Sequence, residues 1–391
     1  MADSGTDHRI LVAGGGYAGL TAAARIGERD LTRALTLIDS KPEFVERIRL
    51  HEIAAGTSPR SLPYAPFMAE RGARFVCTAI ESIDATEKTV RVRGSGGAET
   101  LPYDTLIYAL GSGTDRGAVP GISEHATVLD SPGDAWALRD ALTPGKILLI
   151  AGGGLTAIEA ACEIAERLPA VQVVLAPGRE FGPSDAPGGL STAGFSHIEA
   201  TLDRLGVKVY AGARIKALTA RRALFEDGAE ADFDVCLWAA GFRVPTLARD
   251  AGIAVTNTGQ IVTDETLASV SHPDVIAVGD AAHVVADPGG KCRMSCAAGR
   301  PMGERAAETV AARLGGKAPA PFGFGYAFRC ISLGRDDGLI QFVDAQDRPV
   351  DEVWTGARGA RWKEYICRRT LAGVGFLQNL GPPPDTPPQP S

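Results

Sequence analysis

The chain has 391 residues, of which 45% are hydrophobic and 22% are charged, a composition that suits a folded protein with two or three domains. Its formal net charge is −7, so the chain as a whole lacks the basic excess that nucleic-acid binding requires. No apolar run in the sequence approaches the roughly 20 residues of a membrane-spanning helix. These features speak against a nucleic-acid partner and a transmembrane segment, and they favour small molecules as partners.

The amino-terminal segment, residues 1–9, is polar and lacks the apolar core of a secretory signal. Seven cysteines are scattered along the chain and form no CxxC pair of the metal-binding or redox type. We therefore expect a protein of the reducing cytoplasm with no metal site and no dithiol relay.

The first predicted βαβ unit combines a strand over residues 10–13, a glycine-rich turn, a helix over residues 20–29 and a second strand that ends at Asp39. The turn has the pattern GxGxxG, in which Gly14 permits a tight turn, Gly16 lets the backbone approach a pyrophosphate, and Gly19 allows helix and strand to pack closely. The start of the helix offers free amide groups to phosphates. Asp39 is placed to bind a ribose, so the unit predicts a dinucleotide site.

Strands are predicted next over residues 75–83, 89–93 and 103–110, and a second βαβ unit follows over residues 146–175. Its turn begins at Gly152 and has Ala157 in place of the third glycine, a change that this motif tolerates because it adds only a methyl group. Two nucleotide sites imply two nucleotides. One is expected to be a bound flavin and the other a diffusible nicotinamide.

Further strands are predicted over residues 207–210, 223–226, 234–240 and 275–278, and a helix over residues 297–314. Beyond Pro319 the composition changes: residues 322–369 carry aromatic and basic residues in short strand-like pieces with one late helix. The last stretch is rich in proline and is predicted to be disordered.

Over about residues 8–315 the chain resembles the flavoproteins with two dinucleotide-binding domains, the FAD- and NAD(P)-dependent pyridine nucleotide oxidoreductase family, and within it the type II NADH dehydrogenase-like branch. Four motifs carry the resemblance: residues 14–19 with Asp39, residues 108–112, residues 152–159 and residues 275–280. In that family the aspartate that matches Asp280 bonds the ribityl chain of FAD, and the next helix points its amino end at the flavin. The glutamate that matches Glu159 lies near the nicotinamide, where it can orient the ring or relay a proton. The alternative is a carboxylate that only stabilises the first helical turn.

The resemblance implies an α/β fold with two Rossmann-like domains, the second inserted in the first, and a small carboxyl-terminal α+β module. The expected FAD domain covers residues 1–115 and 240–322, and the NAD(P) domain covers residues 116–239. The module covers residues 323–380, and residues 381–391 form the disordered tail. The expected catalytic residue is Glu159, and the expected cofactor-binding residues are Gly14, Gly15, Gly16, Tyr17, Ala18, Gly19, Asp39, Ser40, Lys41, Ala79, Ala109, Gly111, Gly279, Asp280, Gly152, Gly154, Leu155, Thr156, Ala157, Arg179, Ala240 and Gly241.

The implied activity is that of an FAD-dependent NAD(P)H:acceptor oxidoreductase, with NADH or NADPH as co-substrate. No cysteine precedes Cys77 and no CxxC pair occurs, so the acceptor is expected to meet the flavin directly, as a quinone or another non-thiol acceptor does. Quinone-reducing members have an alanine-glutamine motif where this chain has no glutamine, at residues 296–301. The identity of the acceptor therefore stays open.

Two other functions are left open. The first is a reductase of a small electron-transfer protein, for which a basic surface can be formed by Arg329, Arg335, Arg358, Arg361, Lys363, Arg368 and Arg369. The second is a flavoprotein that senses NAD(P)H without turnover. A homodimer and peripheral attachment to a membrane through residues 361–380 are also left open.

The second strand of the second unit ends in residues 174–180, with apolar residues where an NAD-binding unit has an acid. A 2′-phosphate would meet no fixed negative charge there, and Arg179 can contact it. Glu180 can instead reach the ribose. From these residues we expect NADPH to be accepted at least as well as NADH.

Overall fold

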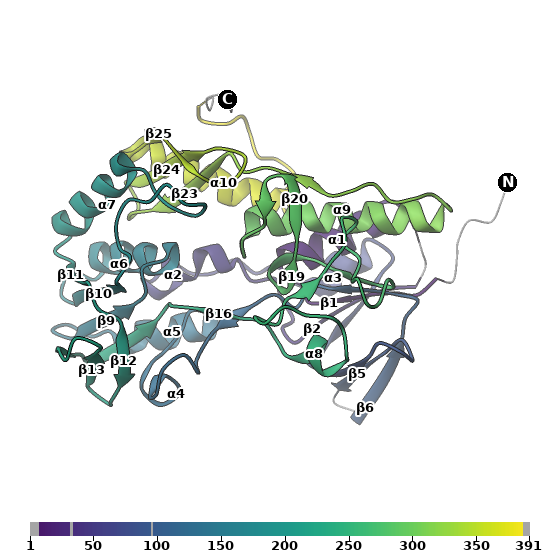
Figure 1. Cartoon of the computed structure of the whole chain (residues 1–391), viewed down its shortest axis with the longest axis horizontal. Coiled ribbons are helices and arrows are strands. Elements are labelled where there is room, and N and C mark those ends of the chain that lie inside the picture. Colours follow the sequence, from purple (N-terminus) through teal and green to yellow (C-terminus); the bar gives the residue numbers. More distant parts are fainter. Residues whose placement is uncertain (1–7, 32–33, 95–96, 386–391) are drawn as a thin grey trace.

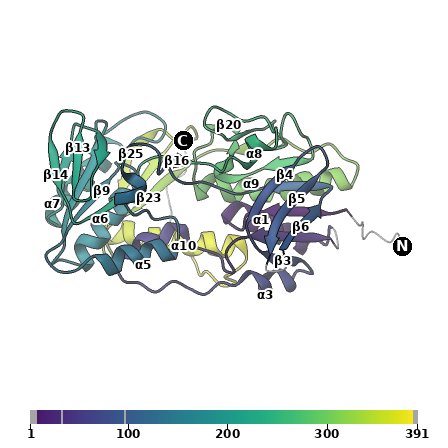
Figure 2. The ribbon, with the colours of Figure 1, turned by 90° about the horizontal axis from the view of Figure 1, so that it is seen from below.

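The structure is a computed structural model that describes residues 8–31, 34–94 and 97–385. The polar start of the chain, residues 1–7, and the end of the predicted tail, residues 386–391, lie outside the described residues. The described chain forms two halves, each built around a parallel sheet, and a smaller third unit that contacts both (Figures 1 and 2).

The first sheet has five strands in the order β18-β7-β1-β2-β3, and all neighbours are parallel. Its strands are β1 (Ile10–Ala13), β2 (Leu35–Asp39), β3 (Arg74–Cys77), β7 (Thr105–Tyr108) and β18 (Val275–Ala277). The strand β18 follows the whole second half in sequence but pairs with β7 of the first half. This pairing supports the proposed insertion of one domain in the other.

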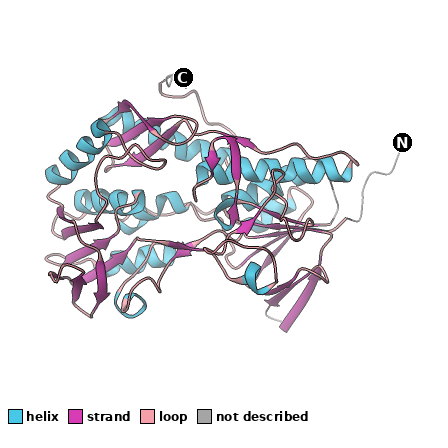
Figure 3. Ribbon diagram, in the orientation of Figure 1, coloured by secondary structure: helices cyan, strands magenta, loops and turns pink. Residues whose placement is uncertain are grey.

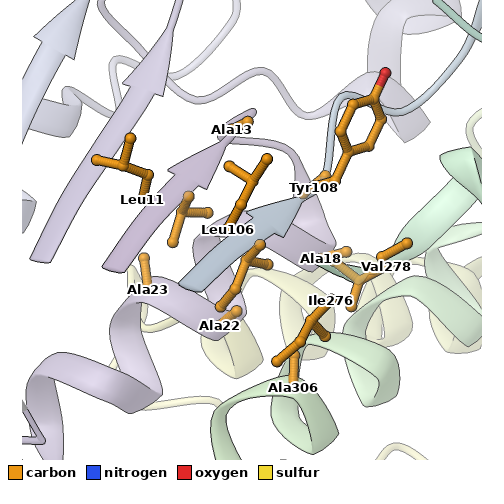
Figure 4. Close-up of a cluster of buried hydrophobic side chains, with 14 of the residues drawn as sticks. Leu11, Ala13, Ala18, Ala22, Ala23, Leu106, Tyr108, Ile276, Val278 and Ala306 are labelled. Atoms are coloured by element: carbon orange, nitrogen blue, oxygen red, sulfur yellow. The ribbon is translucent and has the colours of Figure 1, made fainter. Parts of the chain in front are cut away.

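Helices α1 (Tyr17–Glu28) and α9 (Cys296–Leu314) pack on one face of this sheet, because both present small residues to it. Alanines of α1 and α9 lie against the larger side chains of the strands, as Figure 4 shows for Ala18, Ala22, Ala23, Ala306, Leu11, Leu106 and Ile276. The helices themselves approach so closely that a Cβ atom on Gly303 would lie 2.2 Å from the Ala18 carbonyl oxygen. The close packing fixes the amino end of α1 at the edge of the sheet.

The predicted strand over residues 75–83 is wrong as a single element. The chain forms β3 and then β4 (Ile80–Asp84), which belongs to an antiparallel sheet with β5 (Thr89–Gly94) and β6 (Gly97–Pro102). At the break, the Thr78 amide donates to the Asp39 carbonyl while its hydroxyl donates to the Arg93 carbonyl. Thr78 thus joins two sheets, which alternation of apolar residues alone does not reveal.

The second sheet has four parallel strands in the order β11-β10-β9-β15. They are β9 (Ile147–Ala151), β10 (Gln172–Gly178), β11 (Lys208–Ala211) and β15 (Val235–Trp238), and Figure 3 shows the helices that flank them, α5 (Pro132–Ala141), α6 (Leu155–Arg167) and α7 (Thr192–Arg204). A smaller antiparallel sheet adds β12 (Ile215–Leu218), β13 (Arg222–Phe225) and β14 (Glu230–Asp232).

The two halves are joined by two antiparallel strands, β8 (Gly113–Thr114) and β16 (Phe242–Arg243). The chain leaves the first half through β8 and re-enters it through β16. The proposed domain boundaries near residues 115 and 240 fall beside this pair, which supports them.

The third unit comprises β23 (Phe328–Ser332), β24 (Gly338–Val343), β25 (Pro349–Trp354) and α10 (Gly356–Val374). Its own core is aromatic and includes Phe342, Trp354 and Trp362. Leu371 and Val374 of α10 join the core of the first half, whereas Ile331 and Leu339 join that of the second. The unit therefore bridges the two halves, as α10 does near the top of Figure 1.

Short elements complete the described chain. The helical segments are η1 (Arg47–Arg49), α2 (Leu50–Ala54), α3 (Tyr64–Ala69), α4 (Ile122–His125), α8 (Leu247–Asp250) and η2 (Gly279–Ala281). The remaining strands are β17 (Ile261–Val262), β19 (Ala282–His283), β20 (Val285–Pro288), β21 (Gly290–Lys291) and β22 (Gly323–Phe324). Across residues 8–31, 34–94 and 97–385, no helix has the length and apolar character needed to cross a membrane.

Candidate functional site

Of the three glycines in the GxGxxG pattern of the first turn, packing requires the first and the third but not the second. A Cβ atom on Gly14 would lie 2.4 Å from the Ala109 carbonyl oxygen, and one on Gly19 would lie 1.9 Å from the Gly14 carbonyl oxygen. Gly16 has φ −67°, which any residue adopts, and no heavy atom of the described chain lies within 4 Å of its Cβ position. The fold itself therefore does not require a glycine at position 16. A pyrophosphate bound at this helix start would require one, because it approaches the backbone closely. The loop fits an adenine dinucleotide.

Asp39 holds this loop against the end of β2. Its carboxylate accepts hydrogen bonds from the Gly15 amide at 2.7 Å and from the Lys41 amide at 2.9 Å. Ser40 and Lys41 follow it on the surface. The structure adds Tyr64, whose hydroxyl donates to the Gly15 carbonyl at 2.7 Å. Sequence reasoning missed Tyr64 because it lies on α3, which no motif marks.

The family-derived site residues from separate segments meet at one edge of the first sheet. Strands β1, β7 and β18 are parallel neighbours, so Gly14, Ala109 and Gly279, which follow them, lie at the same edge. The Ser112 hydroxyl donates to Asp280 at 2.7 Å, and burial raises the pKa of Asp280 although Ser112 and Arg47 oppose the rise. The remaining residues expected there take these places: Tyr17 and Ala18 begin α1, Gly111 follows β7, and Ala79 lies exposed between β3 and β4.

The second glycine-rich turn repeats the arrangement of the first. Gly152 has φ +134°, and a Cβ atom there would lie 2.8 Å from the Ala239 carbonyl oxygen. Gly154 has φ −78°, and its Cβ position has no heavy atom of the described residues within 4 Å. Leu155 and Thr156 begin α6, and Ala157 is buried behind them. Ala240 and Gly241 follow β15, and Ala240 accepts a hydrogen bond from the Trp238 indole at 2.8 Å.

Glu159 is neither solvated nor a simple helix-terminal charge, because it is buried in contact with the third unit. One carboxylate oxygen accepts hydrogen bonds from the Lys363 ammonium at 2.8 Å and from the Ser332 amide at 3.0 Å. The other oxygen lies 3.9 Å from Nδ1 of His51 on α2. Glu159, Lys363 and His51 therefore come from three separate elements.

Burial and charge act in opposite directions on this cluster. Burial alone would raise the pKa of Glu159, but the Lys363 ammonium, His51 and the two hydrogen bonds hold it below its ordinary value. For Lys363 burial lowers the pKa, yet Glu159 and neighbouring groups raise it well above its ordinary value. Burial lowers the pKa of His51, whose Nε2 is buried and has no hydrogen-bond partner among the described residues. At neutral pH the cluster thus holds an ionised pair beside a neutral imidazole, which favours a positioning role for Glu159 over proton transfer.

A second set of charges lies beside this cluster. Arg335 of the third unit donates to Glu163 at 2.7 Å and lies 3.2 Å from Glu52 on α2. Glu163 is fully buried, and burial raises its pKa to about 7 although Arg335 opposes the rise. These contacts fasten α2, α6 and the third unit to one another.

The predicted basic surface for a protein partner is not one exposed face. Arg329 is only 2% exposed and donates to Asp347, and Lys363 is engaged by Glu159. Arg335 forms the ion pairs just described. Arg358, Arg361 and Arg369 on α10 are exposed, so only part of the basic surface that the sequence left open is available to a partner. Hydrophobic pattern alone cannot tell a buried, paired cation from an exposed one.

The predicted nicotinamide-side residue Arg179 is not free to act alone. Its Nη2 atom lies 2.7 Å from a carboxylate oxygen of Glu226, the residue that follows β13. The expected acceptance of NADPH relied on Arg179 without this partner, and it stays a prediction.

All seven cysteines lie within the described residues and are unpaired. Burial raises the pKa of six of them. For Cys292 and Cys296 the raised pKa is about 11. Only Cys77 is exposed. Thiols with a raised pKa are mostly neutral near pH 7 and are poor nucleophiles, which argues against a relay through these six cysteines.

A cavity of about 460 Å³ lies between residues 41–60 and α5. Its walls are largely apolar and include Phe44, Ile53 and the half-exposed Trp136, while Arg49 and Glu52 line its polar part. Glu52 adjoins His51 in α2, so the cavity is separated from the Glu159 cluster by one short helix. A flat aromatic molecule fits such walls.

Comparisons with known proteins agree with this geometry. The family described as "Pyridine nucleotide-disulphide oxidoreductase" matches residues 8–309. A Mycobacterium tuberculosis protein named as NADH dehydrogenase-like is 30% identical over 323 residues, which cover 76% of this chain and 78% of that protein. A demethylphylloquinone reductase of Synechocystis sp. is 26% identical over 301 residues, which cover 70% of this chain and 72% of that protein. In the solved structure of the sulfide:quinone oxidoreductase from Aquifex aeolicus the same fold recurs, with a TM-score of 0.80, 20% identity and coverage of 94% of this chain and 91% of that one.

Proposed function

The chain belongs to the pyridine nucleotide-disulphide oxidoreductase family, in its type II NADH dehydrogenase-like branch, and we propose that it passes electrons from NADH or NADPH through FAD to a quinone-like acceptor. It is an oxidoreductase that uses FAD and a nicotinamide nucleotide. When bound, FAD supplies a ring that accepts a hydride and releases the electrons to a second acceptor.

The observation that carries the proposal is the open space at Gly16 and Gly154. Each is the central glycine of its turn and has a φ that any residue adopts. At each, no heavy atom of the described residues lies within 4 Å of the position that a Cβ atom would take. A nucleotide that approaches the backbone closely at both turns would explain why both positions lack a side chain. In this proposal residues 14–19, Asp39 and Asp280 hold the FAD, and residues 152–157 hold the nicotinamide nucleotide.

We propose a positioning role for Glu159, which its contacts support. Its ion pair with Lys363 and its bond to the Ser332 amide keep the first turns of α6 in one place against the third unit. The amino end of α6, which follows Gly154, is thereby held toward the second nucleotide.

The acceptor is proposed to meet the flavin without a thiol intermediate, and the cavity beside α2 is proposed to hold its ring. The apolar walls and Trp136 suit a planar ring, and the polar part of the cavity holds Arg49, which is paired with Glu46, Glu52 and Glu364. Relatives named demethylphylloquinone reductase and type II NADH:quinone oxidoreductase support this class of acceptor.

The proposal is tested by following NADH and NADPH loss with a panel of acceptors: a short-chain benzoquinone, a naphthoquinone, a one-electron dye, a small electron-transfer protein and oxygen. Sustained turnover with a quinone is expected. Trp136→Ala is expected to raise KM for the quinone and to leave KM for the nucleotide unchanged. A flavin that is reduced once and stays reduced with every acceptor would instead support the sensor function.

A further prediction concerns the cysteines. Replacing each of the seven by alanine is expected to leave flavin reduction by the nicotinamide nearly unchanged in every variant that folds, because no thiolate takes part. Rapid mixing of nucleotide with each purified holoenzyme measures this rate. Loss of flavin reduction in one well-folded variant would contradict direct transfer.

A further inference from the structure

The end of β10 is the place where the second βαβ unit meets the ribose of its nucleotide. In units of this type a carboxylate at the end of the second strand accepts a hydrogen bond from the ribose 2′-hydroxyl. Asp39 occupies this place in the first unit, but β10 ends in Ala176, Pro177 and Gly178, none of which has a carboxylate.

Another element delivers a carboxylate to this place. Glu226, at the turn after β13, lies 2.7 Å from the guanidinium of Arg179, the residue directly after β10. Backbone bonds fix the position, because the Glu226 amide donates to the Arg214 carbonyl and the Gly212 amide donates to the Gly178 carbonyl. The side chain of Arg214 lies 3.9 Å from the Cβ position of Gly178. The Glu226 carboxylate and the Arg179 guanidinium therefore meet at the strand end, the Arg214 side chain passes beside it, and Glu180 follows Arg179 in the chain.

The pair contributes little to the stability of the fold. The side chains of Arg179 and Glu226 are 59% and 39% exposed, and ion pairs on such surfaces are weak. The fold therefore does not depend on this pair. The same hairpin carries a pair of similar geometry and exposure, Arg222 with Glu230 at 2.8 Å, which lies on β13 and β14 themselves instead of at the end of β10.

We propose that Glu226 sets the choice between NADH and NADPH. Its carboxylate accepts a hydrogen bond from the 2′-hydroxyl of NADH and, by engaging Arg179, withholds the guanidinium that a 2′-phosphate requires. It also repels that phosphate directly. Without Glu226, Arg179 and Arg214 become the cationic contacts for the phosphate. The inference rests on the proposed function, since it needs a nicotinamide nucleotide at the second turn.

The test compares kcat/KM for NADH and NADPH, with one artificial acceptor, in the parent holoenzyme and three variants. Glu226→Gln is expected to raise the NADPH:NADH ratio of kcat/KM about tenfold, because one repulsive charge is removed and one guanidinium is released. Adding Arg179→Ala to the Glu226→Gln variant is expected to reverse most of that gain, because the released guanidinium is then absent. Glu230→Gln, the matched control, is expected to leave the ratio unchanged.

An unchanged ratio in Glu226→Gln, with full FAD content and activity, would overturn the assignment of Glu226 and leave the proposed function intact. An equal shift in Glu230→Gln would also overturn it, because the effect would then be one of general surface charge. A parent holoenzyme whose flavin neither nucleotide reduces would overturn the proposed function itself.

Discussion

Replacing Gly16 by leucine is expected to yield a folded protein without FAD. The leucine side chain would enter space where the described chain has no heavy atom within 4 Å of the Cβ position, and φ −67° suits any residue. The change at the start of α1 costs about 1 kcal/mol at most, so the fold survives. The side chain would occupy the place proposed for the pyrophosphate. Flavin absorbance and circular dichroism of the purified variant measure the two outcomes.

Gly154→Leu is the matched control, because its geometry is the same at the second turn. It is expected to keep its FAD and to lose kcat/KM for the nicotinamide nucleotide by roughly 100-fold, about the value of one or two hydrogen bonds to a charged group. If Gly16→Leu retained full flavin absorbance, the first turn would not be the FAD site. If both variants lost FAD, the two turns would not serve different nucleotides.

Lys363→Met is expected to destabilise the protein by about 3–5 kcal/mol, because it leaves the Glu159 carboxylate buried without its cation. The double variant Glu159→Gln with Lys363→Met removes both charges and is expected to recover most of the loss. Thermal denaturation of the four proteins in a double-mutant cycle measures the coupling between the two side chains. A loss in the double variant equal to the sum of the losses in the two single variants would show that the pair is not coupled.

The catalytic consequence of the pair is measured separately. Glu159→Gln is expected to slow flavin reduction roughly tenfold to a hundredfold while FAD stays bound, because α6 loses its anchor on the third unit. Glu163→Gln is the control on the same helix, since Glu163 bonds Arg335 one turn further from the nucleotide. If Glu159→Gln reduced its flavin as fast as the parent, Glu159 would have only a structural role.

The pH dependence of the pair follows from the directions of its two pKa shifts. The lowered pKa of Glu159 contributes stability that is present above the ordinary carboxyl range and is lost as pH falls through the folded value. The raised pKa of Lys363 contributes stability that is present below the ordinary lysine range and is lost as pH rises through the folded value. Between roughly pH 7 and pH 10 both groups stay charged and His51 stays neutral, so the coupling energy is expected to be constant there. A coupling that changed near neutral pH would contradict this assignment of charges.

The sequence alone predicts the parts of the site that depend on neighbouring residues. Each glycine-rich turn follows a strand and opens a helix within one short segment, so its local pattern suffices. The meeting of Gly14, Ala109 and Gly279 at one edge then follows from the parallel order of the strands. The two Rossmann-like halves were predicted for the same reason. For the third unit the sequence predicted short strands and one late helix, but not the antiparallel pairing of the strands.

The contacts that the sequence could not predict join residues far apart in the chain. Glu159 and Lys363 are 204 positions apart, and Arg179 and Glu226 are 47 apart. An apolar pattern shows that α10 has a buried face, but it does not show which helix lies opposite. Lys363 was therefore predicted as part of a basic surface, and Glu226 was predicted only as the last residue of a strand.

In the proposed function, electrons pass from the nicotinamide to FAD and then to the acceptor with no thiol between them. A two-step mixing experiment without oxygen tests this path directly. Holoenzyme in which all seven cysteines are alanine, once shown to fold, is mixed first with NADH and then with a naphthoquinone, while flavin absorbance is recorded. We expect the absorbance to fall in the first step and to return in the second, at rates close to those of the parent. A flavin that NADH does not reduce, or one that the quinone reoxidises only when the cysteines are present, would contradict the account.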